Sequence, residues 1–276
     1  NIRECQAIPA TPGTFSYLDP QIEAAPFSGG VQTRTGDVNG DGRTDLIWNQ
    51  LQGGTNQLFV GMSAGDGTFD FTAPFVHPEA ATEGWGNYTL DVADINGDAY
   101  ADLVWNYLGS DAVIGYDNKT YVGLGNGDGT FGTPSVRIHG GQNWSAYGRM
   151  VVGDAMGPTG TADGYDDLIW VRYSTLGIYA GLSEGNSQFD FRPFRSLSGS
   201  SWSTNYTILA ADFDGDADTD VLLNHRAGTN RTYPLRSNGD DTWSLLAYTD
   251  NTAVGNWSNY AVRVGDVTGL GSEALI

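Results

Sequence analysis

The sequence is poor in cysteine, in basic residues and in long apolar stretches, and each shortage excludes a class of protein. Cys5 is the single cysteine among 276 residues, so no internal disulfide can form and stability must come from packing or bound metal. Lys and Arg total 13 against 33 Asp and Glu, a formal net charge of −20. Such a charge argues against nucleic acid and anionic membrane surfaces as partners. No apolar run approaches the roughly 18 residues of a membrane-spanning helix, so we expect no membrane insertion.

Signatures of catalysis are also scarce. Gly61–Gly65 and Gly181–Gly185 match Gly-x-Ser-x-Gly. A nucleophile elbow needs a strand-to-helix turn, however, and both stretches fall where hairpins are expected. His77, His139 and His225 lie far apart in the sequence. Paired carboxylates could act as acid and base, but nearly all clustered ones belong to the loops described next. We therefore expect a protein that is not an enzyme.

The sequence is rich in glycine, with 39 residues, and in loops of alternating acidic side chains. The first loop supplies oxygen at positions 1, 3, 5, 7 and 9 from Asp37, Asn39, Asp41, the carbonyl of Arg43, and Asp45. Such alternation lets a tight turn enclose Ca²⁺, and Gly42 at position 6 permits the bend. An EF-hand would need Glu at position 12, but this loop has Trp48 in a strand-favouring Leu-Ile-Trp stretch. The sequence predicts EF-hand chemistry on a β scaffold.

The loop recurs with a nearly fixed period. Its first Asp lies at 37, 94, 154, 212 and 266, and a period of this size predicts a repeat architecture. The third copy is stretched by residues 157–162, the fifth has lost most side-chain ligands, and Ala99 and Ala217 replace the position-6 glycine. The predicted ligands of copies two to four are Asp94, Asn96, Asp98, Tyr100 and Asp102, then Asp154, Asp163, Tyr165 and Asp167, then Asp212, Asp214, Asp216, Asp218 and Asp220.

Two further markers repeat in phase with the loops. Gly-Asp-Gly-Thr-Phe at 65–69 and 127–131, with looser copies at 185–189 and 239–243, predicts a hairpin turn between two strands. A Trp and a Tyr precede each loop from the second onward. One strand enters each loop, one leaves it, and two flank the hairpin turn. Four antiparallel strands per repeat predict a propeller blade.

We therefore predict one all-β domain, residues 1–276, folded as a five-bladed β-propeller. Full blades are expected at about 26–83, 84–142, 143–200 and 201–255. Residues 1–25 and 256–276 read as two half-blades that pair and close the ring, which removes exposed strand edges. A fragment of a longer, seven-bladed ring is the alternative. Because the chain starts at Asn1 without Met, we expect a mature or trimmed product.

The loop Asp-x-Asn-Gly-Asp-Gly-x-x-Asp-Leu, together with the Gly-Asp-Gly-Thr-Phe turn, resembles the FG-GAP/VCBS repeat family. That family includes the integrin α-subunit propeller, fungal lectins of the Psathyrella velutina type, and repeat regions of bacterial toxins and extracellular enzymes. The resemblance covers nearly the whole chain and implies a propeller with Ca²⁺ in loops on one face. It does not fix a function, because this fold hosts many.

We expect about four Ca²⁺ ions with a structural role. Ligand oxygens of a complete loop enclose the ion and leave little room for a partner, although direct contact between Ca²⁺ and a ligand is the alternative. Millimolar extracellular calcium would fill loops of modest affinity, which favours a secreted protein.

The aromatic markers are the candidate ligand contacts. They could stack on sugar rings, one site per blade, and so give multivalent binding. The alternative is packing between blades, which we expect for Trp48, Trp105 and Trp170 on the strands that leave the loops. The eight candidates are Trp85, Tyr88, Trp144, Tyr147, Trp202, Tyr206, Trp257 and Tyr260.

The sequence thus predicts a secreted, calcium-stabilised propeller that binds glycans or a glycoprotein surface in a lectin-like, multivalent manner. One alternative is a protein-docking module of the adhesion or toxin-scaffold type. Another is the propeller of an extracellular polysaccharide-degrading enzyme, catalytic or not. Several ligands per chain would favour a lectin, and one would favour docking. A larger assembly or a further domain stays open.

Overall fold

The computed structural model describes the greater part of the chain. The described residues are 5–7, 15–17, 31–52, 55–77, 84–108, 118–139, 144, 147–157, 162–173, 175–197, 206–225, 231–240, 242–250, 262–265 and 274–275. Within them the fold is all-β, and helical structure is limited to short 3-10 turns such as η1 (Trp85–Asn87). Among these residues no helix is long and apolar enough to cross a membrane.

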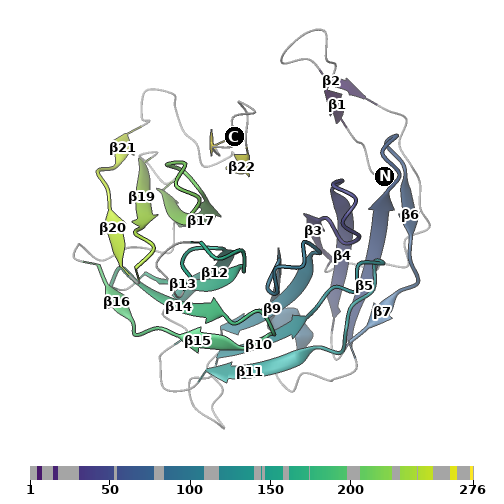
Figure 1. Ribbon diagram of the computed structural model, residues 1–276, viewed down its shortest axis with the longest axis horizontal. Coiled ribbons are helices and arrows are strands. Elements are labelled where there is room, and N and C mark those ends of the chain that lie inside the picture. The colour runs from purple at the N-terminus through teal and green to yellow at the C-terminus, as the bar shows by residue number, and fades with distance from the viewer. Residues whose placement is uncertain are drawn as a thin grey trace. The chain divides into compact units, whose positions relative to one another are not determined.

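Four antiparallel sheets make up most of the described chain, one for each predicted full blade (Figure 1). The first contains β3 (Val31–Gly36), β4 (Asp45–Gln52), β5 (Thr55–Ser63), β6 (Phe69–Phe71) and β7 (Phe75–Val76). The second contains β8 (Thr89–Ala93), β9 (Asp102–Leu108), β10 (Asn118–Gly123) and β11 (Ser135–His139). The third contains β12 (Tyr147–Gly153), β13 (Asp167–Arg172), β14 (Gly177–Ser183), β15 (Phe189–Phe191) and β16 (Arg195–Ser196). The fourth contains β17 (Tyr206–Ala211), β18 (Asp220–His225), β19 (Arg231–Ser237), β20 (Trp243–Leu245) and β21 (Thr249–Asp250).

Each sheet follows the predicted order of strand into loop, strand out of loop, and hairpin pair. In the first, third and fourth sheets, two short strands take the place of one continuous fourth strand. They are β6 and β7 beside β5, β15 and β16 beside β14, and β20 and β21 beside β19. The broken strand is a feature that the sequence did not predict. The four antiparallel strands per repeat are confirmed.

The chain forms two compact units. The first comprises Asn1–Val92, Ala99–Trp105 and Gly123–Pro134, and the second comprises Ala93–Asp98, Asn106–Val122 and Ser135–Ile276. Two small sheets are separate from the four large ones: β1 (Cys5–Ala7) with β2 (Phe15–Tyr17), and β22 (Val264–Gly265) with β23 (Ala274–Leu275). The predicted pairing of these terminal segments into a fifth blade is not among the strand pairings of the described residues, and ring closure stays a prediction.

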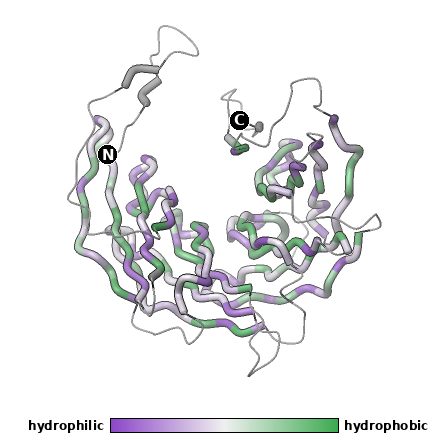
Figure 2. Tube along the Cα trace, turned by 180° about the vertical axis from the view of Figure 1, so that it is seen from behind, coloured by the Kyte–Doolittle hydropathy of each residue, from purple (hydrophilic) through white to green (hydrophobic). Residues whose placement is uncertain are grey.

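The second strands of the second, third and fourth sheets, β9, β13 and β18, are deeply buried. Each contains a continuous apolar run, such as Leu168-Ile169-Trp170-Val171 in β13, where the four side chains have no exposed surface. Such a run is typical of a strand covered on both faces. In the second unit, β13, β14 and β18 share one apolar core with Trp243, while hydrophobic and hydrophilic segments alternate along the outer strands (Figure 2).

Candidate metal sites

The first aspartate of each acidic loop holds the backbone of its own loop. In the first loop, Asp37 Oδ1 accepts a hydrogen bond from Gly40 N at 2.7 Å, and Oδ2 accepts one from Gly42 N at 2.8 Å. Its slight burial acts to raise the pKa of the Asp37 carboxyl, but the amides of Gly42 and Gly40 outweigh this and lower that pKa. The same bonding recurs for Asp94 with Gly97, for Asp154 with Gly164, and for Asp212 with Gly215. Each loop is therefore folded around a carboxylate.

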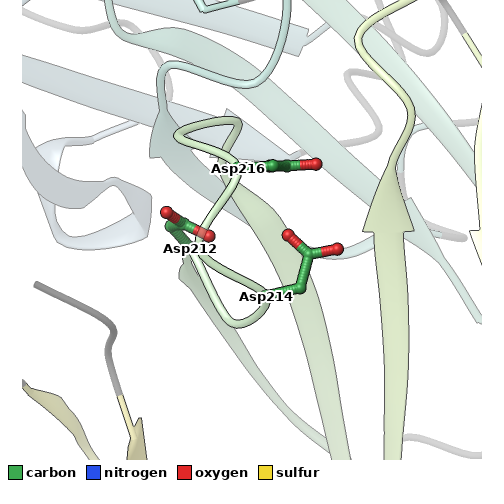
Figure 3. Close-up of side chains that lie close together, drawn as sticks. All are labelled: Asp212, Asp214 and Asp216. Atoms are coloured by element: carbon green, nitrogen blue, oxygen red, sulfur yellow. The ribbon is translucent and has the colours of Figure 1, made fainter.

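The fourth loop, between β17 and β18, brings three carboxylates together. One oxygen each from Asp212, Asp214 and Asp216 lies within 4.8 Å of the others (Figure 3). Asp212 is half-buried and the other two are exposed, so the group is open to solvent on one side. An all-oxygen, acidic set on a tight loop suits a hard cation such as Ca²⁺. The donors of this loop fit the predicted ion.

The first and second loops bring their third and fifth positions together in the same way. Asn39 Nδ2 donates to Asp41 Oδ2 at 3.1 Å, and Asn96 Nδ2 donates to Asp98 Oδ2 at 2.8 Å. Arg43 Nη2 also pairs with the Asp41 carboxylate. The amide and carboxylate of each pair are thus close enough to present their oxygens to one cation. These loops also fit calcium. Position 3 is Asn in both and Asp in the fourth loop, so each has one formal negative charge fewer at that position.

The third loop offers the poorest set of donors. Met156 stands where position 3 would fall, and its side chain is buried. Asp154 accepts hydrogen bonds from the amides of Asp163 and Gly164 at 3.0 and 2.6 Å, and Asp163 in turn accepts one from Tyr165 N at 3.2 Å. Within the described part of this turn, Asp154 and Asp163 are the carboxylates brought together by these bonds, and two carboxylates are a weaker match to a six- to eight-coordinate ion.

The aspartate at position 9 has a second role that the sequence did not predict. Asp45, Asp102, Asp167 and Asp220 are all buried, and each accepts a backbone amide from its own hairpin, donated by Ser63, Gly125, Ser183 and Ser237 respectively, at 2.7–2.9 Å. Burial raises the pKa of Asp167 to about 8 and that of Asp220 to about 6, although these amides act in the opposite direction. These carboxyls tie the loop to the hairpin, and cation ligation by them stays a prediction.

The side chain at position 7 has a role of its own, in addition to the carbonyl that is the predicted ligand. The Tyr100 ring lies against Gly40 of the first loop, where an added Cβ would come within 2.6 Å of it. The Tyr165 ring lies against Gly97 of the second loop in the same way, at 2.5 Å. The side chain of Asp218, at the same position of the fourth loop, accepts a hydrogen bond from Ala162 N at 2.6 Å. The position-7 side chains of the second, third and fourth loops therefore contact the loop before their own.

Backbone hydrogen bonds connect the same loops. The amide at position 8 donates to the carbonyl of position 1 in the preceding loop at 2.7 Å in three cases: Ala101 to Asp37, Asp166 to Asp94, and Thr219 to Asp154. The sequence signal for these contacts is the recurrence of a bulky position-7 residue opposite a position-4 glycine, a pattern that the ligand spacing alone does not explain.

Four of the predicted ligand-binding aromatics lie in the interior, which corrects that prediction. Trp85 and Trp144 have no exposed surface, and Tyr88 and Tyr147 are also buried. Each Trp packs against the Tyr of its own marker, with ring centroids 4.8 and 4.9 Å apart. Rings enclosed in this way cannot stack on a sugar, because the aromatic marker fills space in the core. Tyr206 is half-buried, and Trp202, Trp257 and Tyr260 lie outside the described residues.

The packing role of two other tryptophans is confirmed. Trp105 and Trp170 are fully buried. Each donates from Nε1 to an asparagine of the preceding repeat: Trp105 to Asn49 Oδ1 at 2.9 Å, and Trp170 to Asn106 Oδ1 at 3.3 Å. A buried indole N–H needs such an acceptor. The asparagine directly after the Leu-Ile-Trp or Leu-Val-Trp stretch was the signal in the sequence.

Two histidines that the sequence showed only as distant residues are repeat-mates. His77 lies 4.4 Å from Trp85 and 5.4 Å from Trp105, measured between ring centroids. His139 lies 6.1 Å from Trp144 and 5.5 Å from Trp170. Both histidines are buried. They are packing residues, and this arrangement gives no support to a catalytic role for either.

Comparisons with known proteins agree with this repeat structure. The sequence model of the FG-GAP-like repeat matches residues 37–105 and 161–223. These two stretches are therefore FG-GAP-like repeats, as their acidic loops predict. A search of curated proteins found no match.

Two solved structures share the fold. One is an Agrocybe aegerita lectin described as recognising non-reducing terminal N-acetylglucosamine, with 16% identity and a TM-score of 0.54 over 89% of this chain and 60% of the lectin chain. The other is the Photorhabdus luminescens Tc holotoxin pore, with 20% identity and a TM-score of 0.55 over 99% of this chain and 12% of the toxin chain. The chain thus spans less than two thirds of either protein, and likeness at this identity concerns the fold alone.

Proposed function

We propose that this protein is a calcium-stabilised β-propeller that binds carbohydrate and catalyses no reaction. The observation that carries the calcium part is the set of three carboxylate oxygens, from Asp212, Asp214 and Asp216, within 4.8 Å of one another on one loop. The first and second loops add Asn–Asp pairs of similar chemistry. We propose about four ions in total, with the third loop as the weakest site.

In this proposal Ca²⁺ acts on stability. When it is bound, the ion neutralises the carboxylates that the loop folds together. An ion that binds only the folded chain stabilises it by about 2.7 kcal/mol per site at a concentration 100-fold above its Kd. Millimolar calcium outside cells would suffice for sites of modest affinity, and a secreted protein is part of the proposal. The five-bladed ring closed by the two terminal segments also belongs to it.

Carbohydrate is the proposed ligand for two reasons. The fold is shared with a lectin whose description names N-acetylglucosamine as its ligand. The net charge of −20 disfavours nucleic acid and anionic surfaces, while neutral sugars are unaffected by it. Since the markers at Trp85 and Trp144 are buried, the contact residues must lie elsewhere.

The calcium proposal is tested by thermal unfolding and isothermal titration, first with calcium and then with EDTA. We expect calcium to raise the unfolding temperature by several degrees. Asp214→Asn should remove a larger part of that rise than Asp163→Asn, because Asp214 belongs to the converging set. Equal unfolding temperatures in calcium and EDTA would contradict the proposal.

The carbohydrate proposal is tested by a glycan array in millimolar calcium, with titration of each hit to count sites. Binding of a defined glycan supports a lectin-like module. An array without hits would count against it and would favour the protein-docking alternative.

A further inference from the structure

A row of polar and aromatic side chains crosses the fourth sheet at the strand ends far from its acidic loop. Tyr206 on β17 pairs in register with His225 on β18, which pairs with Arg231 on β19, which pairs with Asp250 on β21. Residues directly opposite one another on antiparallel strands bring their side chains together on one face. The row therefore presents four functional groups side by side, none of which the calcium loop uses.

Aromatic rings extend this row into a cluster. Tyr206 lies 4.7 Å from His225 and 5.9 Å from Tyr233, and Tyr233 lies 5.3 Å from Tyr248, measured between ring centroids. The Arg231 guanidinium sits 4.8 Å from the Tyr248 ring centroid and pairs with Asp250 at 3.2 Å. Tyr248 is 49% exposed, so one face of this cluster is open to solvent.

The equivalent row of the third sheet shows why this opening exists. There Gly177 stands in the place of Arg231, and the Phe194 ring lies over it, so close that an added Cβ would be 2.2 Å from the ring. Phe194 also packs within 5.6 Å of Arg172. In the fourth sheet the Arg231 side chain fills the space above the strand, and Tyr248, the counterpart of Phe194, is exposed. With arginine in the place of glycine, the Tyr248 ring packs on a guanidinium of the same sheet instead of on the strand, and it is exposed where Phe194 is half-buried.

The chemistry of this surface matches a sugar ring. A pyranose has an apolar C–H face, which packs on an aromatic ring, and an edge of hydroxyls that both donate and accept hydrogen bonds. Tyr248 offers the ring, the Asp250 carboxylate accepts, and the Arg231 guanidinium donates in a fixed planar geometry. The pair is locally neutral and the whole chain carries −20, so an acidic sugar is disfavoured relative to a neutral one.

We propose that the surface formed by Arg231, Tyr233, Tyr248 and Asp250 is a single binding site for a neutral hexopyranose residue of a glycan. The sugar ring stacks on Tyr248, and its vicinal hydroxyls bind Asp250 and Arg231. This inference rests on the proposed carbohydrate function and deepens it. The third sheet lacks this site, because it carries Gly177 and Phe194 at the equivalent places.

The experiment titrates the full chain in calcium with four neutral methyl glycosides, those of glucose, galactose, mannose and N-acetylglucosamine, and with methyl glucuronide. Saturation-transfer NMR measures binding. We expect at least one neutral glycoside to bind and the glucuronide to bind more weakly. Tyr248→Ala should weaken that binding by about tenfold or more, since an aromatic anchor of an exposed site carries much of its affinity. Arg231→Gln and Asp250→Asn should each weaken it as well.

The matched control is Ile138→Ala. Ile138 is 59% exposed on the outer strand β11, so its replacement removes a similar exposed apolar group away from this surface and should leave binding unchanged. Unfolding temperature verifies that each variant is folded. If a glycoside binds and all three site variants bind it as the parent does, this inference is wrong while the carbohydrate function stands. If the parent binds none of the glycosides and no glycan on the array, both fail.

Discussion

The contact between the second and third repeats and the contact between the third and fourth repeats share a backbone plan and differ in their interior side chains. In both, the amide of loop position 8 donates to the carbonyl of position 1 of the preceding loop, at 2.7 Å. In both, a hairpin serine hydroxyl donates to the carbonyl of position 2: Ser183 to Ile95 at 2.6 Å, and Ser237 to Ala155 at 2.7 Å. The loop end of the two contacts is therefore the same.

The interior side chains of the two contacts differ in polarity. The second-to-third contact holds a polar set, with Trp170 donating to Asn106, Asn106 donating to Asn118, and His139 beside Trp170. The corresponding positions of the third-to-fourth contact are all apolar, and they lie in or against one hydrophobic core: Val171, Leu176, Leu197 and Leu223. The contact between the first and second repeats carries the polar set again, as Asn49, Asn56, His77 and Trp105. The four positions have changed together, because a buried amide without its partner is costly.

The largest predicted effect tests whether the set acts as a unit. Trp170→Leu shortens a fully buried side chain and removes the donor to Asn106. We expect a loss of about 3 kcal/mol in the free energy of unfolding. Asn106→Val combined with Trp170→Leu, which copies the apolar contact, should cost about 1–2 kcal/mol less than the sum of the single changes.

Denaturant unfolding of the parent, both single variants and the double variant closes this cycle. Leu223→Trp is the reverse control, and it should destabilise by about 1–3 kcal/mol because it overpacks an apolar contact. If the double variant loses the sum of the two single losses in unfolding free energy, within about 0.5 kcal/mol, the two residues are independent.

The next prediction concerns pH, since only the polar set contains a histidine. Burial, and secondarily Arg137, lowers the pKa of His139 to about 4 from 6.5. The unfolded chain therefore binds a proton before the folded one as the pH falls. Stability should be lost between pH 6.5 and 4 and should level off below, by about 3 kcal/mol in total. His139→Leu, which copies Leu197 of the apolar contact, removes this dependence.

Carboxylates titrate in the same range, so the measurement is the difference in unfolding free energy between the parent and His139→Leu at each pH. The parent should lose stability relative to the variant as the pH falls from 6.5 to 4. A difference that does not change with pH would mean that His139 is not held neutral by its surroundings.

A smaller effect is expected at the loop end, where the two contacts agree. Ser183→Ala and Ser237→Ala each remove one buried hydroxyl donor, so each should cost about 1 kcal/mol. Equal losses in the two variants would confirm that the loop end does not depend on the interior set. Ser63→Ala is the control, since the Ser63 hydroxyl accepts from Gly65 N of its own turn. A loss of stability in only one of the two variants would show that the loop ends of the two contacts are not equivalent.

The sequence predicted the repeat period, the strand order and the loops, because each of these is a local pattern. Asp37 and Gly42 take their shape from residues within the same turn. It left open whether Trp85 and Trp144 contact a ligand or pack in the core, since a tryptophan flanked by Gly, Ser and Asn is compatible with either place. It did not show that His77 and His139 are equivalent, because their partners come from the next repeat, beyond any local window.

The smallest predicted effect concerns backbone strain at loop position 6. Ala99 and Ala217 occupy the place of Gly42 and keep its left-handed backbone, with φ of 67° and 76° against 79°. An added Cβ at Gly42 meets no atom within 4 Å, so the loop tolerates alanine sterically and the cost is conformational. Ala217→Gly should therefore stabilise the chain by up to about 1 kcal/mol, and Gly42→Ala should destabilise it by a similar amount. Gly40→Ala should cost more than Gly42→Ala, because its Cβ would also displace the Tyr100 ring that joins two consecutive loops. Denaturant unfolding in EDTA measures these differences without a contribution from calcium binding. Equal losses of stability in Gly40→Ala and Gly42→Ala would show that the contact between consecutive loops adds nothing to stability.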